Sequence, residues 1–303
     1  MKKKTNKQPL VSIIMNCFNG ETYLKESIES VLSQTYKNWE LIFWDNKSKD
    51  KSADIFKSYN EKKLKYYYAH EHTNLYKARN EAIKKSNGDF IAFLDSDDFW
   101  EQDKLELQVE LFKDLDVAVV YGNCFIINEN LNTRSLYLKK KIPKGIILNS
   151  LLKKYHTGLV TLVIRKSYLD NQKSPFDDSF HIIGDFDLMI RMSAKYKFDC
   201  INKPIASWRV HGKNESLINK TMQINELKIW RNKMKDFPII YNNKNFSYIN
   251  VMIHNLEIVN LILKKNISEA KIKIQKMPHS LKKIKYIIAL LLPHNFVKKF
   301  IRF

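Results

Sequence analysis

The most informative part of the sequence is Phe90–Trp100, which reads FIAFLDSDDFW. Its apolar half, Phe90–Leu94, is followed by three carboxylates, Asp95, Asp97 and Asp98. A continuous apolar run of strand length is typical of a parallel strand buried on both faces, and ligands bind at the carboxyl ends of such strands. Because unpaired buried charge is costly, the stretch predicts a divalent metal site. The alternative is that Asp97 or Asp98 caps a following helix.

Strand and helix patterns alternate before this stretch. Short apolar runs predict strands over residues 10–15, 39–44 and 64–69. Helical spacing predicts helices over residues 24–32 and 75–86, and a further helix capped by Ser48 or Asp50. Asn87-Gly88 should end the helix before Phe90 in left-handed backbone. The alternation predicts an α/β fold, with a mostly parallel sheet covered by helices on both faces.

The pattern changes in the second half of the chain. Strands are expected over residues 117–121, 160–164 and 205–211, a loop or hairpin over 128–144 and a short helix over 188–194. Helices are expected over residues 222–234, 248–264, 267–276 and 281–292. We therefore expect an α/β domain over residues 1–217 and an α-helical appendage over residues 218–303.

Charge is distributed unevenly over the 303 residues. The net charge is +20, and residues 218–303 contain 17 Lys or Arg but only four Asp or Glu. This excess indicates an acidic partner, either nucleic acid or an anionic membrane surface. We expect the membrane and no nucleic acid, because the tail has no interleaved aromatic stacking platform and no recognisable nucleic-acid-binding motif. The segment Leu281–Phe303 mixes cations with apolar residues, which suits a helix in a membrane interface; a core helix with a basic outer face is the alternative.

Cysteine usage and the short apolar runs bear on location. Cys17, Cys124 and Cys200 show no metal-ligand spacing and suggest no disulfide framework, which favours a reducing compartment. Leu10–Met15 is too short for a signal sequence, and no run reaches the roughly 20 apolar residues that span a bilayer. A cytoplasmic protein, peripheral at the inner face of the cell membrane, is expected.

Polar clusters follow three of the predicted strands. They are residues 16–21, 44–50 and 95–98, reading NCFNGE, WDNKSKD and DSDD. Because the carboxyl ends of parallel strands share one edge of a sheet, these clusters should meet at one ligand.

These clusters and two later segments resemble family 2 glycosyltransferases of the bacterial cell-surface polysaccharide type. The similar segments are VSIIMNCFNGETYLKESIESVLSQTYKNWELIFWDNKSKDKS, ARNEAIKKSNGDFIAFLDSDD with its DXD motif, GDFDLMIR and WRVHGKNES. The resemblance covers roughly residues 9–217 and implies the GT-A fold. It also implies a hexosyl- or N-acetylhexosaminyl-transferase that uses a nucleoside diphosphate sugar, with UDP as the first choice.

The resemblance assigns roles to particular residues. The nucleotide-binding residues that it implies are Asn16, Phe18, Glu21, Asp45, Arg79, Asp95 and Ser96. Asp97, with Asp95 and His211, would hold Mn²⁺ or Mg²⁺, and Arg209 would contact the diphosphate. Three alternatives stay open: Phe18 as a core residue, Arg79 in a surface salt bridge and His211 as a merely hydrogen-bonded residue. Asp98 is expected to cap the following helix.

The general base implied by the resemblance is Asp185. It would take the proton of an acceptor hydroxyl in a single inverting displacement. Asp187 is the competing candidate, but it should face away and pair with Arg191, four residues on.

Three positions depart from the family pattern. Asn16 replaces the usual Pro, Asn46 replaces a second acidic residue, and Lys47-Ser48 replaces Gly-Ser or Gly-Thr. The acceptor is expected to be a growing, lipid-linked cell-surface glycan. The alternatives are a soluble or protein acceptor, and a non-catalytic relative that binds a membrane or nucleic acid.

Overall fold

The computed structural model describes residues 8–170, 174–293, 296, 297 and 300, without the side chain of residue 130. The chain divides into two compact units, residues 1–214 and 215–303. The boundary inferred from composition, after residue 217, falls three residues beyond this division.

The N-terminal part of the first unit forms four parallel strands. Its strands are β1 (Val11–Cys17), β2 (Trp39–Asp45), β3 (Leu64–Tyr68) and β4 (Phe90–Phe93). They lie in the order β3-β2-β1-β4, and every neighbouring pair is parallel. All residues of β1 and β4 are buried, as continuous apolar runs predict. Parallel pairing aligns the carboxyl ends of β1 and β2, where Cys17 pairs with Asp45.

The sheet continues beyond β4 with mixed pairing. The further strands are β5 (Phe99–Trp100), β6 (Val117–Asn128), β7 (Thr133–Leu136), β8 (Val163–Arg165) and β9 (Lys197–Val210). The order after β4 is β8-β6-β9-β5, with β7 paired to β6. β8 is antiparallel to β4 and β6, whereas β6 and β9 are parallel. The β6–β7 hairpin accounts for the polar segment expected as a loop or hairpin.

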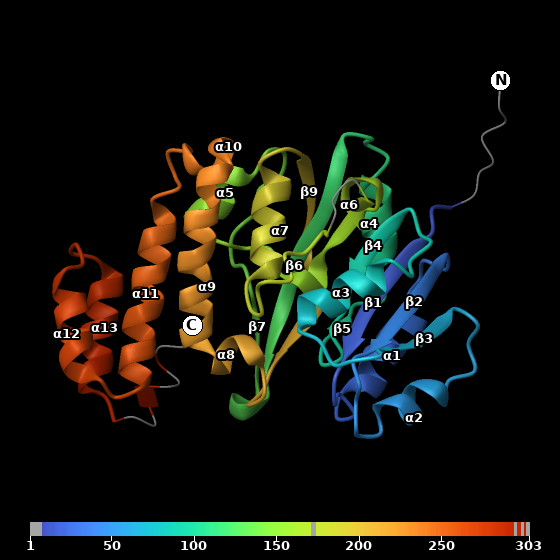
Figure 1. Ribbon diagram of the computed structural model, residues 1–303, viewed down its shortest axis with the longest axis horizontal. Coiled ribbons are helices and arrows are strands. Elements are labelled where there is room, and N and C mark those ends of the chain that lie inside the picture. The colour runs from blue at the N-terminus through green and yellow to red at the C-terminus, as the bar shows by residue number, and fades with distance from the viewer. Residues whose placement is uncertain (1–7, 171–173, 294–295, 298–299, 301–303) are drawn as a thin grey trace. The chain divides into compact units, whose positions relative to one another are not determined.

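Helices cover both faces of the sheet, so the predicted α/β architecture is confirmed. They are α1 (Leu24–Leu32), α2 (Ser52–Lys57), α3 (Leu75–Ile83), α4 (Lys104–Leu111), α5 (Leu148–Lys153), α6 (Ser167–Asp170) and α7 (Gly184–Ser193), with 3₁₀ turns at Glu129–Leu131 and Leu159–Thr161. Side chains of α1 and α4 join alternate residues of β1 in one core cluster. α3 and α7 lie in front of the sheet in Figure 1.

Two local expectations are wrong. Gly88 does not adopt left-handed backbone; it is required because a Cβ there would lie 2.7 Å from Leu10 O and Ser12 N. α4 begins at Lys104 with Asp103 as its N-cap residue, so Asp98 does not cap it. Gly88 is explained by its contact with β1, and Asp98 by a hydrogen bond to Arg209 of β9. Neither contact can be predicted from the neighbouring residues in the sequence.

The second unit is helical. Its helices are α8 (Glu215–Ile218), α9 (Lys220–Lys233), α10 (Pro238–Tyr241), α11 (Tyr248–Leu263), α12 (Ile267–Gln275) and α13 (Leu281–Leu291), with a 3₁₀ turn at Met234–Asp236. The four helices expected from periodicity correspond to α9, α11, α12 and α13, each within two residues at either end. Ile258, Ile262, Ile274 and Tyr286 form a core among α11, α12 and α13. Within the part of the chain that is described, none of the helices is both long and apolar enough to cross a membrane.

Candidate active site

The loops after β1 and β2 are tied together by hydrogen bonds between backbone and side chains. Asn19 N–H donates to Ser48 Oγ at 3.0 Å, and Lys49 N–H donates to Asn19 Oδ1 at 2.8 Å. Glu21 Oε2 accepts from Lys51 N–H at 2.9 Å. The predicted nucleotide residue Glu21 therefore braces two loops at the carboxyl edge of the sheet.

Asp45 lies at the end of β2 and is fully buried. Its carboxylate accepts from Ser48 N–H and from Tyr66 Oη–H, both at 2.7 Å. Burial and the Asp45 carboxylate raise the pKa of Tyr66, so its hydroxyl remains a donor. Asp45 is thus held in one orientation at the site.

Asn16 and Phe18 lie at the end of β1 with different surroundings. Asn16 is 6% exposed, and its amide nitrogen and oxygen have no partner among the described residues. A buried amide without a partner is unusual and indicates a site for a ligand or water. Phe18 is 48% exposed, with its ring 4.2 Å from that of His72, so the core-packing alternative for Phe18 is wrong.

Arg79 and Asp95 connect α3 to the DXD segment. Arg79 is 3% exposed, its guanidinium lies over the ring of Tyr76, and it donates to Asp95 Oδ1. The surface salt-bridge alternative for Arg79 is therefore wrong. The Asp95 side chain is 38% exposed, so it remains accessible to a ligand.

Ser96 follows Asp95 in close contact with the first loop. A Cβ at Gly20 would lie 2.8 Å from Ser96 Oγ, so glycine is needed for this approach. The carbonyls of Ser96 and Asp98 lie 3.0 and 2.6 Å from Ser27 Oγ, which anchors the DXD backbone to α1.

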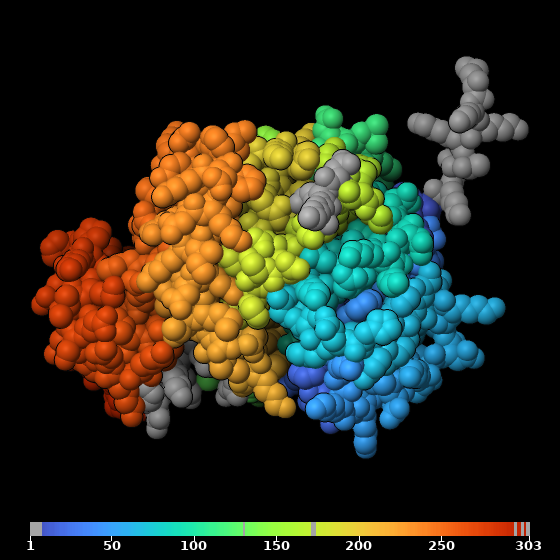
Figure 2. All heavy atoms as spheres, viewed as in Figure 1, coloured from blue at the N-terminus to red at the C-terminus, as the bar shows by residue number. Residues whose placement is uncertain are grey.

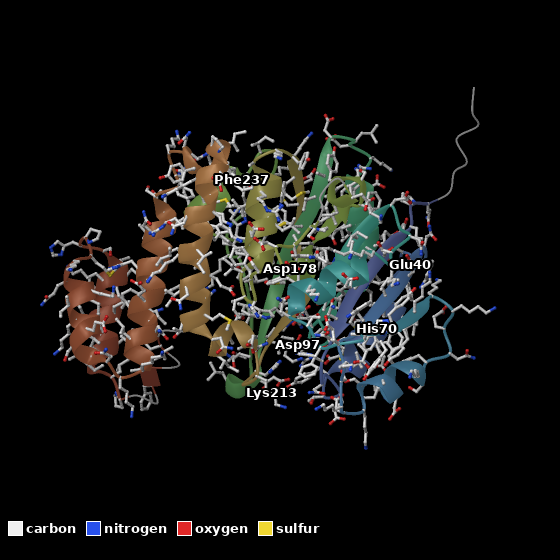
Figure 3. The ribbon with its side chains drawn as sticks, in the orientation of Figure 1. Glu40, His70, Asp97, Asp178, Lys213 and Phe237 are labelled. Atoms are coloured by element: carbon white, nitrogen blue, oxygen red, sulfur yellow. The ribbon has the colours of Figure 1, made fainter. Side chains whose placement is uncertain are left out.

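Asp97 faces the end of β9. Its Oδ2 lies 3.0 Å from His211 Nε2, and Lys213 N–H donates to His211 Nδ1 at 3.2 Å. Because Nδ1 accepts, the neutral imidazole carries its proton on Nε2 and donates to Asp97. The hydrogen-bonded role left open for His211 is therefore present. Ligation of a metal by Nε2 would require the proton to move to Nδ1, which would end the hydrogen bond from Lys213 N–H. Asp97 and Lys213 lie near each other in Figure 3.

Asp98 and Arg209 form a buried connection between the DXD segment and β9. Asp98 Oδ1 accepts from Arg209 N–H at 2.8 Å, which is its role in place of the expected helix cap. Burial, and then the carboxylates of Asp97 and Asp95, raise the pKa of Asp98 well above its ordinary value. The Arg209 guanidinium donates to the Asp97 carbonyl, Glu129 and Glu26. Contact between Arg209 and a diphosphate would require some of these partners to be exchanged.

The carboxylates of Asp95 and Asp97 and the imidazole of His211 are the candidate metal ligands. No group of three or more His, Cys, Asp or Glu side chains within the described ranges has metal-binding geometry, and one oxygen of Asp95 faces Arg79. The side chains of Asp97 and Asp95 are 30% and 38% exposed, and both offer hard oxygen donors. Mg²⁺ and similar ions take one or two protein carboxylates and complete their coordination with water and phosphate. The residues fit an ion that arrives with a diphosphate, and not an ion held by protein ligands alone.

Asp185 lies in the first turn of α7, beside two tyrosines. Its Oδ1 is 3.2 Å from Tyr76 Oη, and its Oδ2 is 3.2 Å from Tyr155 Oη. Burial raises the pKa of Asp185, and the charge of Arg79 opposes that rise. Asp187 accepts from Arg191 Nε at 2.9 Å, so the predicted pairing of Asp187 is confirmed.

Three features of the site were not predicted from the sequence: the contacts of Tyr76 and of Tyr155 with Asp185, and the need for glycine at position 184. A Cβ at Gly184 would lie 2.6 Å from the Tyr76 ring, so the start of α7 packs directly on α3. Asn80 of α3 also holds the segment that leads into α7. Its side chain accepts a hydrogen bond from Phe176 N–H and donates one to Phe176 O. The surfaces of α3 (cyan) and of the segment leading into α7 (yellow-green) adjoin in Figure 2. A glycine at the start of a helix, directly before a candidate base, was the available signal.

Comparisons with known proteins agree with this geometry. The family model "Glycosyl transferase family 2" matches residues 12–195. The Escherichia coli protein named UDP-Glc:alpha-D-GlcNAc-diphosphoundecaprenol beta-1,3-glucosyltransferase WfgD is 39% identical over 167 residues, which are 55% of this chain and 64% of WfgD. The putative teichuronic acid biosynthesis glycosyltransferase TuaG of Bacillus subtilis (strain 168) is 30% identical over 173 residues, 56% of this chain and 68% of TuaG.

Solved structures show the same fold. The mannosyltransferase PcManGT from Pyrobaculum calidifontis, in complex with GDP-Man and Mn²⁺, has a TM-score of 0.64 and 15% identity, and the match covers 98% of this chain and 86% of that one. S. aureus TarS 1-349, in complex with UDP-GlcNAc, has a TM-score of 0.62 and 16% identity, and the match covers 96% and 87% of the two chains. The fold is GT-A, as the sequence implied. The chain belongs to glycosyl transferase family 2, a family of glycosyltransferases.

Proposed function

We propose that this chain is an inverting, metal-dependent glycosyltransferase that moves a sugar from a UDP donor to a hydroxyl of a lipid-linked glycan. The observation that carries the proposal is the environment of Asp185: a buried carboxylate with a raised pKa, held between two tyrosine hydroxyls. Asp187, the other candidate for the general base, forms a salt bridge with Arg191.

Asp185 acts as the general base. A carboxylate with a raised pKa accepts a proton more readily than one in water, which suits abstraction from a hydroxyl. The acceptor O–H proton passes to Asp185 as the acceptor oxygen bonds to the anomeric carbon. The bond from that carbon to the diphosphate oxygen breaks, and the nucleoside diphosphate leaves with the electron pair. Attack opposite the leaving group inverts the configuration.

The nucleotide is assigned to the carboxyl ends of β1, β2 and β4. The unpartnered amide of Asn16 and the exposed ring of Phe18 provide a polar and an apolar surface for a base. Asp45 and Glu21 hold the loops around the base. The phosphates would lie next to the DXD segment, near Arg79, Asp95 and Ser96. UDP is preferred because WfgD, which is 39% identical over 167 residues, has a name that specifies UDP-Glc. TarS, whose structure contains UDP-GlcNAc, and PcManGT, whose structure contains GDP-Man, are similar in fold and do not decide between the two nucleotides.

Asp97 and Asp95 would hold Mn²⁺ or Mg²⁺, with His211 as a further ligand in the tautomer that carries its proton on Nδ1. Such an ion supplies positive charge that stabilises the departing diphosphate. The similar fold of PcManGT, whose structure contains GDP-Man and Mn²⁺, supports this part of the proposal. Arg209, next to Asp97, adds positive charge on the same side.

The acceptor class rests on a relative. WfgD, which is 39% identical over 167 residues, carries a name that specifies a GlcNAc-diphosphoundecaprenol acceptor. We therefore assign this chain a sugar hydroxyl on a lipid diphosphate. The sugar transferred is a hexose or an N-acetylhexosamine.

Release of UDP tests the reaction. UDP-glucose and UDP-GlcNAc are incubated with Mn²⁺ and the full chain, with and without a GlcNAc-diphospholipid acceptor. Asp185→Asn should lower UDP release by a factor of about 10³ or more, and the exposed Asp178→Asn should leave it unchanged. UDP release that is unaffected by Asp185→Asn, or absent with every donor and metal, would overturn the proposal.

The second unit is assigned a membrane role, with the protein cytoplasmic and peripheral at the inner face of the membrane. Tyr286 and Ala289 of α13 pack into the core, so the core-helix alternative holds for one face only. Another face is apolar and exposed: Leu281, Ile284, Ile288 and Leu291 are 87%, 53%, 42% and 80% exposed. Their spacing places them on one side of the helix.

The charge of the surrounding segment supports an anionic lipid surface as the partner of this face. After Glu269 the sequence contains nine Lys or Arg and no acidic residue. An apolar stripe bordered by cations binds the interface of anionic membranes.

Vesicle flotation tests this assignment. The double variant Ile284→Asp/Ile288→Asp should lose most binding to anionic vesicles. Ile272→Asp, an equally exposed position on α12, should retain it. Equal flotation of both variants and the parent chain, or equal binding to neutral vesicles, would contradict the proposal.

A further inference from the structure

The loops after β1, β2 and β3 are joined through Asn46. Its backbone N–H donates to Cys17 O at 2.8 Å, at the end of β1. Its side chain holds the loop between β3 and α3, because Nδ2 donates to Thr73 O at 2.7 Å and Oδ1 accepts from Thr73 N–H at 3.2 Å. An ionised carboxylate cannot donate a hydrogen bond, so the acidic residue that is usual at this position could not make the contact with Thr73 O. Asn46 therefore fixes the loop that carries His72.

His72 lies exposed in that loop, and its tautomer follows from its contact with Asn46. Nδ1 lies 2.9 Å from Asn46 O, and a carbonyl can only accept, so Nδ1 carries the proton. In the neutral ring Nε2 is then an acceptor, and it has no hydrogen-bond partner among the residues that the structure describes. The loop after β3 thus presents an unused acceptor at the carboxyl edge of the sheet.

The ring of His72 also contacts the ring of Phe18, which lies in the loop after β1. The ring centroids are 4.2 Å apart and the planes are inclined by 43°, so no third ring fits between them. Phe18 is 48% exposed and His72 is exposed as well, so the pair is not part of the core. The buried amide of Asn16, two residues before Phe18, has no partner among the described residues. An exposed aromatic surface with unsatisfied polar groups nearby in the chain suits a planar heterocycle that also forms hydrogen bonds.

We propose that His72 is a nucleoside-binding residue of the donor site. Its ring and that of Phe18 form the surface on which the base stacks, and Nε2 accepts a hydrogen bond from the nucleoside. In uridine the available donors are N3–H of uracil and the ribose hydroxyls. Asn46 acts through His72 and is a positioning residue. The inference rests on the proposed UDP donor and adds which residue recognises its nucleoside.

Isothermal titration calorimetry of the full chain with UDP and Mn²⁺ tests the proposal without turnover. His72→Ala should weaken UDP binding about tenfold or more, because both the stacking surface and the acceptor are lost. His72→Phe keeps an aromatic ring and loses the nitrogens, so it should weaken binding about three- to tenfold. The matched control is His70→Ala, an exposed histidine of the same loop that is labelled in Figure 3; it should change the affinity by less than about twofold.

Three analogues of UDP identify the group that donates to Nε2. N3-methyl-UDP, 2′-deoxy-UDP and 3′-deoxy-UDP each lack one of the possible donors. The analogue without the group that faces Nε2 should bind the parent chain about tenfold more weakly than UDP. In His72→Phe the same analogue and UDP should bind almost equally, because the partner of that group is already absent. The other two analogues should lose the same factor in both chains.

The outcomes separate this inference from the proposed function. Equal UDP binding by the parent chain and His72→Ala overturns the role of His72 and leaves the proposed function intact, and so does an equal loss in His70→Ala and His72→Ala. Penalties that are the same in the parent chain and in His72→Phe for all three analogues overturn the hydrogen bond to Nε2. A parent chain that binds no UDP overturns the donor assigned under the proposed function and this inference with it.

Discussion

The guanidinium of Arg79 is buried on α3, yet it donates to the Asp95 carboxylate, whose side chain is 38% exposed. An arginine stays charged in proteins, so this buried cation depends on a carboxylate that is also a candidate ligand for the substrate and metal. One side chain thus serves both stability and the proposed chemistry. Asp97 differs, because its partner His211 can be neutral.

The first prediction compares these two aspartates. Asp95→Asn should lower the free energy of unfolding by about 2 kcal/mol, less than a fully buried pair because Asp95 is partly exposed. Asp97→Asn should cost less than about 1 kcal/mol, because the His211 Nε2–H can still donate to an amide oxygen. Urea denaturation of both variants measures the difference. An equal cost would mean that Arg79 does not rely on Asp95.

The second prediction concerns the contact between α3 and α7. Gly184→Ala places a Cβ within 2.6 Å of the buried Tyr76 ring, whose hydroxyl is anchored to Ile182 O. We expect a loss of about 1–3 kcal/mol of stability and reduced UDP release, because Asp185 is the next residue. The matched control is Gly158→Ala, where no atom of the described residues lies within 4 Å; it should change stability by less than about 0.5 kcal/mol. Thermal unfolding distinguishes the two, and indistinguishable melting temperatures would refute the close packing.

Local patterns in the sequence were sufficient to predict most of the strands and helices. The apolar runs before Cys17, Asp45 and Asp95 identify β1, β2 and β4, because buried strands need continuous apolar residues. Their parallel pairing then brings the predicted polar clusters to one edge. The order β8-β6-β9-β5 could not be predicted in this way, since it depends on pairing between segments far apart in the chain.

The same limit applies to the site. Asp98 was expected to cap a helix because capping is a local signal, but its partner is Arg209, 111 residues away. Tyr76 and Tyr155 have no motif of their own, and only the fold brings their hydroxyls to Asp185. The backbone at position 47 explains the family's usual glycine: φ is +67°, in the left-handed region that favours glycine, and Lys47 adopts this conformation without that advantage.

The third prediction is a gain in stability when the proposed base is removed. Because burial raises the pKa of Asp185, its protonated form stabilises the folded state, and that contribution is lost as pH rises through the folded-state pKa. At pH 7.5 the neutral Asp185→Asn should therefore raise the melting temperature by a few degrees while abolishing UDP release. The gain should shrink towards zero as the pH falls and Asp185 becomes protonated in the parent chain.

Asp187→Asn is the control for that experiment. Asp187 is 3% exposed and pairs with Arg191, so its neutralisation should lower stability at pH 7.5. Urea unfolding of both variants at pH 7.5 and pH 5 gives the comparison. A destabilised Asp185→Asn at pH 7.5 would show that the charge of Asp185 is favourable in the folded state.

The fourth prediction tests the backbone of the loop after β2. Lys47 has a φ of +67°, and a side chain in left-handed backbone costs about 1–2 kcal/mol. Lys47→Gly removes this cost but increases the entropy of the unfolded chain, so we expect stability to rise by up to about 1 kcal/mol. Lys49→Gly, in the same loop but outside the left-handed region, removes no strain and should lower stability by about 0.5–1 kcal/mol. Urea unfolding measures both changes, and a loss of stability in Lys47→Gly equal to that in Lys49→Gly would show that the left-handed conformation at Lys47 carries no strain.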